Sequence, residues 1–382
     1  MPGVLIVSER ALPGRGGLAV ATSRIAKQAA ARGEQVHLLA FSKDSAPGAR
    51  GRREQDGVVV HPLGPPATEE RRLMALTDHA VELAREHDLD VVHGMYATRG
   101  GYVATLAAAI VGARSVIAIR GNDLDRGLYR AADLPFLAHA MRHATVATAV
   151  SRSAAERASA IFDRPVEHVT NSVDAARFSP ERRDNTLAAA LGLEPDAAVL
   201  GFVGELREKK GMRFLLPAFA HLCEQRSARL LLIGGLRADA REAFEAFERS
   251  APEAAARIVT VDYARDADRL TRLLALCDLM VFPSLYEGTP NAVLEAMASA
   301  RPVLATAVGG HTDLITHGET GALLGLDALD RLPEAIEELL DLPREERDRL
   351  GAAARAHVLE RHRPEDESDA WAEVYARARS AS

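Results

Sequence analysis

Short apolar runs alternate with longer amphipathic stretches along the first half of the chain. The apolar runs predict strands over residues 4–7, 35–40, 58–61, 90–93, 116–119, 145–149 and 166–169. Alanine-rich stretches with helical spacing predict helices over residues 18–31, 69–86, 101–111, 134–142 and 153–162. Strands and helices that alternate in this way favour a parallel sheet with helices on both faces.

The same pattern restarts after a segment that ends at Pro180. Strands are expected over residues 199–203, 230–233, 258–261, 279–282 and 303–305, and helices over residues 212–225, 239–250, 267–276, 291–299 and 332–340. We therefore expect an α/β protein with two doubly wound, Rossmann-like domains, residues 1–180 and 181–364. Ligands bind beyond the carboxyl ends of such strands, so domains that face each other would enclose the active site in a cleft.

The last segment, residues 365–382, has a helical pattern of its own. It contains Trp371, the only tryptophan, and Tyr375, and Pro364 marks the expected bend before it. A length of 382 residues is enough for two domains with separate cores.

Composition indicates a globular protein, because 47% of the residues are hydrophobic and 26% are charged. No apolar run approaches the ~20 residues that a membrane span needs. The N-terminus runs into a strand without a basic leader, so we do not expect a signal peptide. Cys223 and Cys277 lie in apolar contexts and are expected to be free thiols, which fits a cytoplasmic location.

The net charge of −7 is unevenly distributed. Residues 1–180 carry 22 basic and 19 acidic side chains. Neither half has the strongly basic face of a nucleic-acid-binding protein. The mildly positive first half is compatible with an anionic acceptor or peripheral membrane contact, but ordinary variation between domains is the preferred explanation.

The most informative motif is Glu287-Gly-Thr-Pro-Asn-Ala-Val-Leu-Glu295, which follows an apolar strand. Thr289 is a suitable N-cap and Pro290 suits the first helical position, so Glu287 is expected in the loop and Glu295 in the second helical turn. Free backbone N–H groups and the positive helix end lie between the two carboxylates. This arrangement suits an anionic sugar derivative, although two surface glutamates around an ordinary turn would give the same spacing.

The motif resembles the Glu-x7-Glu signature of retaining GT-B glycosyltransferases, in particular family 4. The resemblance implies that Glu287 and the amides after it, from Gly288, Thr289, Asn291 and Ala292, hold the donor sugar, and that Glu295 accepts from the ribose hydroxyls. It also implies that the terminal helix 365–382 packs back onto the N-terminal domain, which binds the acceptor.

A basic loop, Gly204-Glu-Leu-Arg207-Glu-Lys-Lys210-Gly211, follows the first strand of the second domain. Cations placed at a departing nucleoside diphosphate stabilise its growing charge without a metal. The loop resembles the Gly-x-x-Arg-x-x-Lys-Gly element of the family, with Arg207 and Lys210 in the matching positions. A solvated turn is the alternative, but lysine is rare in this chain: only Lys27, Lys43, Lys209 and Lys210 occur.

The first strand is followed by a glycine-rich loop that contains Gly14, Gly16 and Gly17. Backbone without Cβ atoms can approach a phosphate or a sugar closely at a helix N-terminus. The spacing is neither a dinucleotide fingerprint nor a Walker loop. It is similar to the Gly-Gly loop near the donor in GT-B enzymes.

Two further positions depend on the resemblance. Arg120, before Asp123 and Asp125, stands where the family often has a histidine that reaches the donor sugar. We expect Arg120 to be tied to one of these aspartates, or to a carboxylate or phosphate of a substrate. Tyr263 lies where these enzymes hold the nucleotide base, although a surface tyrosine is an alternative.

The sequence therefore predicts a cytoplasmic, retaining glycosyltransferase that uses a nucleotide-diphosphate sugar, most plausibly UDP-linked, and needs neither a cofactor nor a metal. The acceptor is unknown: polysaccharide or glycolipid assembly and small-molecule glycosylation are both open, with a soluble acceptor modestly favoured. A 2-epimerase-type isomerase on the same scaffold and a non-catalytic nucleotide-sugar binder are the alternatives. Product formation distinguishes the three.

Overall fold

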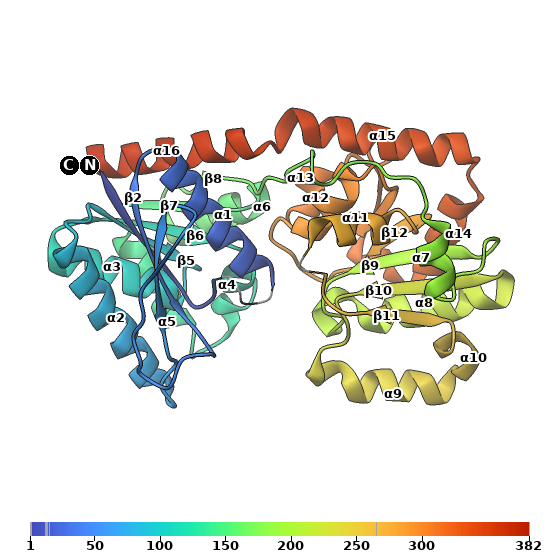
Figure 1. The fold of residues 1–382 in the computed structure, drawn as a ribbon, viewed down its shortest axis with the longest axis horizontal. Helices are drawn as coiled ribbons and strands as arrows, with labels where there is room; N and C mark the ends of the chain where they lie inside the picture. Colours follow the sequence, from blue (N-terminus) through green and yellow to red (C-terminus); the bar gives the residue numbers. More distant parts are fainter. Residues whose placement is uncertain (1, 12–13, 15, 265, 382) are drawn as a thin grey trace. The chain divides into compact units, whose positions relative to one another are not determined.

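The structure is a computed structural model that describes residues 2–11, 14, 16–264 and 266–381. The chain forms two compact units (Figure 1): unit 1 comprises residues 1–171 and 365–382, and unit 2 comprises residues 172–364. Each unit is described by itself below.

The division between the units falls after Asn171, earlier than the expected boundary at Pro180. The intervening segment is bonded to unit 2. The backbone N–H of Val173 donates to the carbonyl of His362 at 3.0 Å, and the carbonyl of Arg177 accepts from Thr271 Oγ1 at 3.2 Å. These bonds attach residues 172–180 to unit 2.

Unit 1 is built on an eight-stranded sheet in the order β3-β4-β2-β1-β5-β6-β7-β8. All neighbouring pairs are parallel except β3 and β4. The strands are β1 (Gly3–Ser8), β2 (Gln35–Phe41), β3 (Arg53–Gln55), β4 (Val58–Leu63), β5 (Val91–Met95), β6 (Arg114–Ile119), β7 (Val146–Ala149) and β8 (Glu167–His168). The order reverses between β1 and β5, and ligands of doubly wound sheets bind at such a switch point.

Helices flank this sheet and join most of its strands. They are α1 (Gly17–Ala31), α2 (Glu69–Glu86), α3 (Arg99–Val111), α4 (Asn122–Asp125), the 3-10 helix η1 (Gly127–Tyr129), α5 (Leu134–His143), α6 (Arg152–Phe162) and α16 (Pro364–Ser380). The terminal helix α16 contributes to the core: Trp371 and Tyr375 are buried in the same cluster as Val4 and Ile25. The chain therefore completes unit 1 only with its last helix.

Unit 2 contains a six-stranded sheet in the order β11-β10-β9-β12-β13-β14, and all its pairs are parallel. The strands are β9 (Ala198–Val203), β10 (Ala228–Ile233), β11 (Ile258–Val261), β12 (Leu279–Phe282), β13 (Val303–Thr306) and β14 (Ala322–Leu324). Here the strand order reverses between β9 and β12. The two predicted motifs directly follow these two strands.

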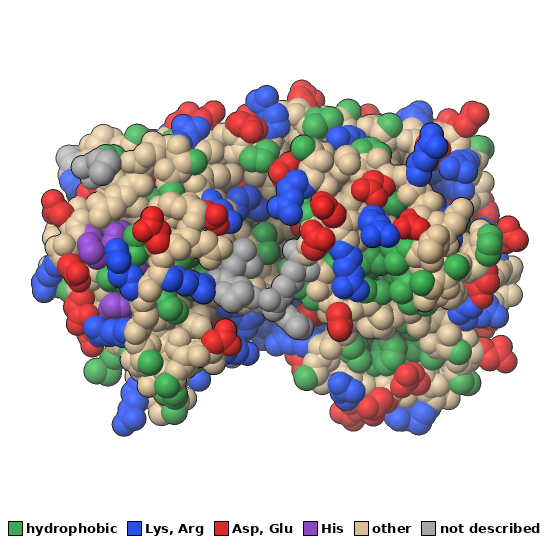
Figure 2. All heavy atoms as spheres, in the orientation of Figure 1, with side chains coloured by type: hydrophobic (Ala, Val, Ile, Leu, Met, Phe, Trp, Pro, Cys, Tyr) green, Lys and Arg blue, Asp and Glu red, His purple; other side chains and the backbone are tan. Residues whose placement is uncertain are grey.

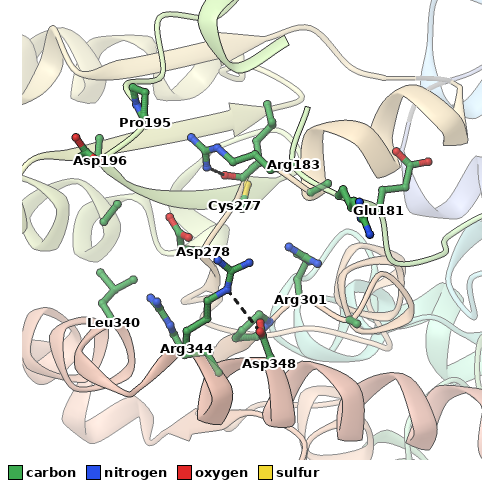
Figure 3. Close-up of a pocket in the computed structure, with 18 of the residues that line it drawn as sticks. Glu181, Arg183, Pro195, Asp196, Cys277, Asp278, Arg301, Leu340, Arg344 and Asp348 are labelled. Carbon is green, nitrogen blue, oxygen red and sulfur yellow. Dashed lines mark hydrogen bonds and ion pairs between the residues drawn. The ribbon is translucent and has the colours of Figure 1, made fainter. Parts of the chain in front are cut away.

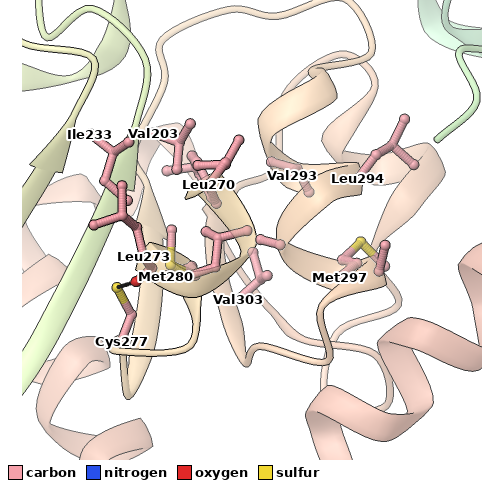
Figure 4. Close-up of a cluster of buried hydrophobic side chains, with 14 of the residues drawn as sticks. Val203, Ile233, Leu270, Leu273, Cys277, Met280, Val293, Leu294, Met297 and Val303 are labelled. Atoms are coloured by element: carbon pink, nitrogen blue, oxygen red, sulfur yellow. Dashed lines mark hydrogen bonds between the residues drawn. The ribbon is translucent and has the colours of Figure 1, made fainter. Parts of the chain in front are cut away.

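The helices of unit 2 include several that the apolar pattern did not predict. They are α7 (Asn185–Ala190), η2 (Glu208–Lys210), α8 (Met212–Gln225), η3 (Ala238–Ala240), α9 (Arg241–Ser250), α10 (Pro252–Ala255), α11 (Ala267–Leu274), α12 (Asn291–Ala298), α13 (His311–Leu314), η4 (Leu326–Arg331), α14 (Leu332–Asp341) and α15 (Arg344–Arg361). On one face of the sheet, side chains of α11 and α12 pack against the strands, and Figure 4 shows Leu273 and Val293 beside Met280 and Val303. This packing holds the start of α12 over the end of β12.

The described surface is polar and mixed in charge. Figure 2 shows Lys and Arg side chains interspersed with Asp and Glu over the visible face. Among the described residues, none of the helices combines the length and the apolar character required to cross a bilayer.

Candidate active site

The loops after β9 and β12 are locked together by a close backbone approach. Gly211 has φ +75°, and a Cβ atom there would lie 1.8 Å from the carbonyl oxygen of Pro283. Only glycine fits this position, because any side chain would collide with the neighbouring backbone. The N–H of Leu285 also donates to the carbonyl of Lys209 at 2.9 Å. The basic loop therefore lies directly against the segment that leads to Glu287.

Glu287 is the centre of this arrangement. Its side chain is buried, and its carboxylate accepts from Lys210 Nζ at 2.5 Å, from Lys209 Nζ at 3.2 Å and from Ser284 Oγ at 3.1 Å. Burial alone would raise the pKa of Glu287, but the charges of Lys210 and Lys209 outweigh that effect and hold the pKa well below its usual range. Glu287 is thus an ionised carboxylate at neutral pH.

Lys209 is a site residue that our sequence reasoning left out. Its ammonium group contacts Glu287 and lies 4.7 Å from the centre of the Tyr286 ring, a cation–π arrangement. Burial lowers the pKa of Lys209, Glu287 opposes the shift, and the charges of Lys210 and Arg207 add to it. The pair of adjacent lysines in a lysine-poor chain was the signal that could have identified Lys209.

The loop after β13 supports Glu287 from another side. Gly309 has φ +48°, and a Cβ atom there would lie 1.8 Å from the carbonyl oxygen of Glu287. The N–H of Gly310 donates to the carbonyl of Gly288 at 2.8 Å. The backbone around Glu287 is therefore fixed by contacts that require glycine at Gly309.

His311, at the start of α13, was also missed. It is fully buried, and its Nδ1 lies 2.8 Å from the carbonyl oxygen of Thr306, which can only accept a hydrogen bond. Burial lowers the pKa of His311 to about 4, against the attraction of Glu287. The ring is therefore neutral at pH 7. Its Nε2 is buried and has no hydrogen-bond partner among the described residues.

The start of α12 differs from the expectation. The helix begins at Asn291, with Pro290 as the N-cap at φ −77° and ψ 123°, and no side chain caps it. The expected capping role of Thr289 is therefore wrong. The Thr289 side chain lies against the loop after β13 instead: a Cβ atom on Gly310 would be 2.6 Å from Thr289 Oγ1.

The remaining predicted residues of unit 2 surround the same two loops. Gly204, with φ +125°, begins the basic loop, and Glu295 and Ala292 are half-buried in α12. Arg207 Nε and Asn291 Oδ1, in these loops, are buried and lack a hydrogen-bond partner among the described residues. Such atoms are unusual in a folded protein and are candidates for ligand contacts. Tyr263, half-buried, follows the more distant strand β11.

In unit 1, Gly16 is the N-cap of α1 with φ +103°, and Gly17 is the first residue of that helix. Both follow β1, at the switch point of the first sheet. Residues 12, 13 and 15 of the predicted glycine-rich loop lie outside the described residues.

Arg120 follows β6 in unit 1 and is half-buried. Its guanidinium donates to Asn171 Oδ1 at 2.5 Å, and burial lowers its pKa to about 10. The expected pairing with a neighbouring aspartate is wrong for the side chain. Asp123 accepts instead from the backbone N–H of Arg120 at 2.9 Å, and Asp125 pairs with Arg157 at 2.7 Å.

Tyr96, after β5, was not singled out from the sequence. It has φ +71°, an uncommon conformation for a large side chain, and strained residues cluster at functional sites. Burial raises the pKa of Tyr96 to about 12. The negative charge of Asp123 adds to this shift, and the positive charge of Arg120 opposes it. The crowded turn that follows, in which a Cβ atom on Gly100 would lie 2.2 Å from the carbonyl of Met95, holds Tyr96 in place.

Together, unit 2 presents at the carboxyl edge of its sheet two ammonium groups on one buried carboxylate, a buried arginine N–H and a helix N-terminus. Cations and backbone amides in this arrangement bind phosphate groups, and the carboxylates accept from hydroxyls. The arrangement can hold a phosphorylated sugar derivative.

Comparisons with known proteins agree with this chemistry. Residues 197–342 match the family model "Glycosyl transferases group 1", and residues 15–177 match "Glycosyltransferase Family 4". The GDP-mannose-dependent alpha-mannosyltransferase of Mycobacterium tuberculosis is 30% identical over 94% of this chain and 93% of its own length. The N-acetyl-alpha-D-glucosaminyl L-malate synthase of Bacillus anthracis is 26% identical over 95% of this chain and 94% of its own length.

Solved structures show the same fold. Sucrose-phosphate synthase from Thermosynechococcus elongatus superimposes with a TM-score of 0.84 at 18% identity and covers 100% of both chains. Anabaena HepE in complex with UDP-glucose superimposes with a TM-score of 0.79 at 19% identity, over 98% of this chain and 99% of its own. The predicted GT-B fold class, with two parallel-sheet α/β domains, is confirmed. The two family models and the mycobacterial relative show that the chain is a glycosyltransferase and belongs to glycosyltransferase family 4.

Proposed function

We propose that this glycosyltransferase moves a sugar from a nucleotide-diphosphate sugar to an acceptor hydroxyl with retention of the anomeric configuration. The observation that carries the proposal is the buried Glu287 carboxylate with Lys209 and Lys210, at the switch point of the unit 2 sheet. The bond from the anomeric carbon to the diphosphate oxygen breaks, and the acceptor oxygen bonds to the same face of the sugar. The departing phosphate accepts the proton of the acceptor hydroxyl.

The lysines and Arg207 are assigned to the diphosphate. Each ammonium has three N–H donors, so its contact with Glu287 leaves donors for phosphate oxygens. The buried Nε of Arg207 has no partner among the described residues and supplies another donor. Because these cations stand where negative charge grows on the leaving group, the reaction needs no metal. Metal independence is part of the proposal.

Glu287 and the backbone after it are assigned to the sugar. The carboxylate has two oxygens with several lone pairs, so it can accept from a sugar hydroxyl while it holds both lysines. The N-terminal amides of α12 and Asn291 Oδ1 add contacts from the other side. Glu295 is assigned to the ribose hydroxyls and Tyr263 to the base. Gly16, Gly17 and Arg120 of unit 1 stay predicted substrate contacts.

The donor is proposed to be UDP-linked. HepE was solved with UDP-glucose, which supports the proposal only through a shared fold. A GDP-linked donor is a second candidate, because the relative at 30% identity is a GDP-mannose-dependent enzyme. A thermal-shift panel of UDP, GDP, ADP and TDP sugars decides between them, since a ligand at 100 times its Kd adds about 2.7 kcal/mol of stability.

The reaction itself is tested with the best donor from this panel and a set of soluble acceptors. We expect a new glycoside whose anomeric proton coupling, measured by NMR, matches that of the donor. Inverted configuration would refute the same-face mechanism. A sugar epimerised without transfer, or binding without any product, would support the isomerase or the non-catalytic binder instead.

A further inference from the structure

A charged cavity lies in unit 2, at the sheet edge opposite to Glu287. Its lining includes Ala198, the first residue of β9, and residues 275–278 and 300–302, which directly precede β12 and β13. The candidate active site follows the carboxyl ends of these same strands. Because the strands are parallel, the cavity and the donor site occupy opposite edges of one sheet.

The cavity has a volume of about 810 Å3 and is rich in arginine (Figure 3). A volume of this size suits a small metabolite. Six arginines and four acidic residues line it; the arginines are Arg182, Arg183, Arg226, Arg301, Arg344 and Arg347. The arginines come from the segment before α7, the end of α8, the loop before β13, and α15. Separate segments of unit 2 thus contribute arginine side chains to the lining of one cavity.

Four acidic residues also line the cavity. Asp278 Oδ2 accepts from the backbone N–H of Val199 at 2.8 Å, and the exposed Asp348 pairs with Arg344 at 3.6 Å, the contact drawn as a dashed line in Figure 3. The other two, Glu181 and Asp196, are exposed to solvent. Six arginines against four acidic residues leave the lining with a net positive charge.

Two arginines of the lining, Arg183 and Arg301, are half-buried and form no ion pair with a carboxylate among the described residues. Arg183 Nη1 donates to the carbonyl of Leu276 at 2.8 Å, and its Nη2 is buried with no hydrogen-bond partner among the described residues. Arg301 Nε donates to the carbonyl of Ser299 at 3.1 Å. In the part of the chain that the structure describes, neither guanidinium has an ion pair. The charges of Asp278 and Asp348 act on Arg301 from beyond ion-pair distance. An anion bound directly to the two guanidinium groups would compensate for their partial burial, so its binding would be favourable.

Arg301 and Arg183 both lie close enough to Cys277 to act on its thiol. Burial and the charge of Asp278 raise the pKa of that thiol to about 12, and the charges of Arg301 and Arg183 oppose the shift. Figure 3 shows the labelled Arg183 and Cys277 above Asp278, with Arg301 to one side. Arg347 of α15 lines the same cavity and also has no ion pair within the described ranges.

We propose that this cavity binds the phosphate group of a small phosphorylated metabolite, at a site separate from the donor site. A phosphate carries up to two negative charges and three terminal oxygens, and planar guanidinium groups match its geometry. In the proposal, it contacts Arg183, Arg301 and Arg347, which line the cavity from three different segments.

The test is calorimetric titration of the full chain with inorganic phosphate and, separately, with glucose 6-phosphate. UDP is present at saturation so that the diphosphate subsite is filled. We expect saturable binding of at least one probe, weakened about tenfold or more in Arg301→Gln and Arg347→Gln, because hydrogen bonds to charged groups are worth roughly 1.5–3 kcal/mol. Arg349→Gln, on the same helix but outside this cavity, is the matched control and should bind like the wild type.

The arms of the experiment separate the outcomes. Tighter binding of glucose 6-phosphate identifies a sugar phosphate as the ligand class, and equal binding identifies the free phosphate group. The proposal is overturned if neither probe binds. It is also overturned if binding weakens in Lys210→Met but not in the cavity variants. If Arg301→Gln does not fold, Arg347→Gln on the partly exposed face of α15 decides alone. Glycosyl transfer is measured in parallel, so failure of this site is distinguishable from failure of the proposed function.

Discussion

Lys210 Nζ lies 2.5 Å from Glu287 Oε1, although 77 residues separate the two in the sequence. Lys209 Nζ lies 3.2 Å from the other oxygen of the same carboxylate. One buried anion thus holds two adjacent cations at the edge of the sheet. Removal of the carboxylate would leave two ammonium groups facing each other.

The first prediction concerns the two lysines. Lys209→Met and Lys210→Met should each lower kcat about 100-fold or more while KM changes less, because the charge on the diphosphate grows in the transition state. Steady-state kinetics with the best donor measure this, and Lys27→Met, on the surface of unit 1, is the control. Wild-type turnover in either variant, or activity that EDTA abolishes, would contradict the assigned roles.

The second prediction compares two glycines with similar backbone conformations. Gly192 has φ +68° and Gly211 has φ +75°, but a Cβ atom meets nothing within 4 Å at Gly192 and the carbonyl of Pro283 at Gly211. Gly192→Ala should cost only about 1 kcal/mol of unfolding free energy, from backbone strain. Gly211→Ala should cost more and should also reduce kcat/KM, since it separates the basic loop from Glu287.

Denaturant unfolding and kinetics of both variants test this comparison. Equal losses of stability with unchanged activity in both would show that the close approach at Gly211 does not position the site.

The third prediction is a pH dependence of stability centred on His93. His93 is fully buried, its Nδ1 lies 2.9 Å from Tyr375 Oη, and burial lowers its pKa to about 3. The unfolded chain therefore binds a proton that the folded chain does not between pH 6.5 and about 3. Stability contributed by the neutral ring is lost as the pH falls through this window, by about 1.4 kcal/mol per pH unit for one proton.

The unfolding free energy of wild type, His93→Gln and the exposed-site control His221→Gln should be measured between pH 7 and pH 5. His93→Gln should flatten the slope, and His221→Gln should not. Parallel slopes for all three variants would mean that His93 is not buried as a neutral ring.

The fourth prediction concerns the attachment of α16. Glu367 is buried, and it accepts from Arg24 Nε at 2.6 Å. Glu367→Gln leaves that guanidinium without its carboxylate, so unfolding free energy should fall by about 3 kcal/mol. Glu373→Gln, on the exposed side of the same helix, should change stability by less than about 0.5 kcal/mol. Chemical denaturation curves of the two variants provide the comparison.

The fifth prediction concerns Arg120, which stands where the family resemblance led us to expect a histidine. Asn171 Oδ1 accepts both from Arg120 Nη2 and, at 2.9 Å, from Arg24 Nη2. Arg120→Ala and Arg120→His remove one donor from this bridge, and kcat/KM should fall about tenfold or more. Arg114→Ala, at the other end of β6, is the control. If Arg120→His equals wild type on every donor and acceptor, the position tolerates either residue.

The buried strands were the easiest elements to predict. Leu279–Phe282 is β12 as expected, because a run of apolar residues with both faces buried is visible without any partner. The long helix α15, in contrast, was missed. Only Leu350, Gly351, Ala354 and Val358 are buried in it, so it has too few apolar positions for a periodic signal.

The site was predictable where it depended on local spacing. Two motifs near strand ends indicated that Glu287 and the basic loop serve the same donor, but the contacts of Lys209 and Lys210 with the Glu287 carboxylate were not predicted and are seen only in the folded loops. The bridge at Asn171 joins segments that are distant in the sequence, and no spacing within the sequence encodes such a contact. His311 and Tyr96 depend on backbone conformations that only the structure reveals.

The placement of α16 has a consequence for synthesis on the ribosome. Trp371, Val374, Tyr375 and Ala378 belong to the same buried cluster as Val4 and Ile6 of the first strand. Unit 2 is translated as one uninterrupted stretch between the two parts of unit 1. The first strands therefore lack part of their core until α16 has been synthesised, so the N-terminal sheet is an incomplete nascent domain while unit 2 is being made.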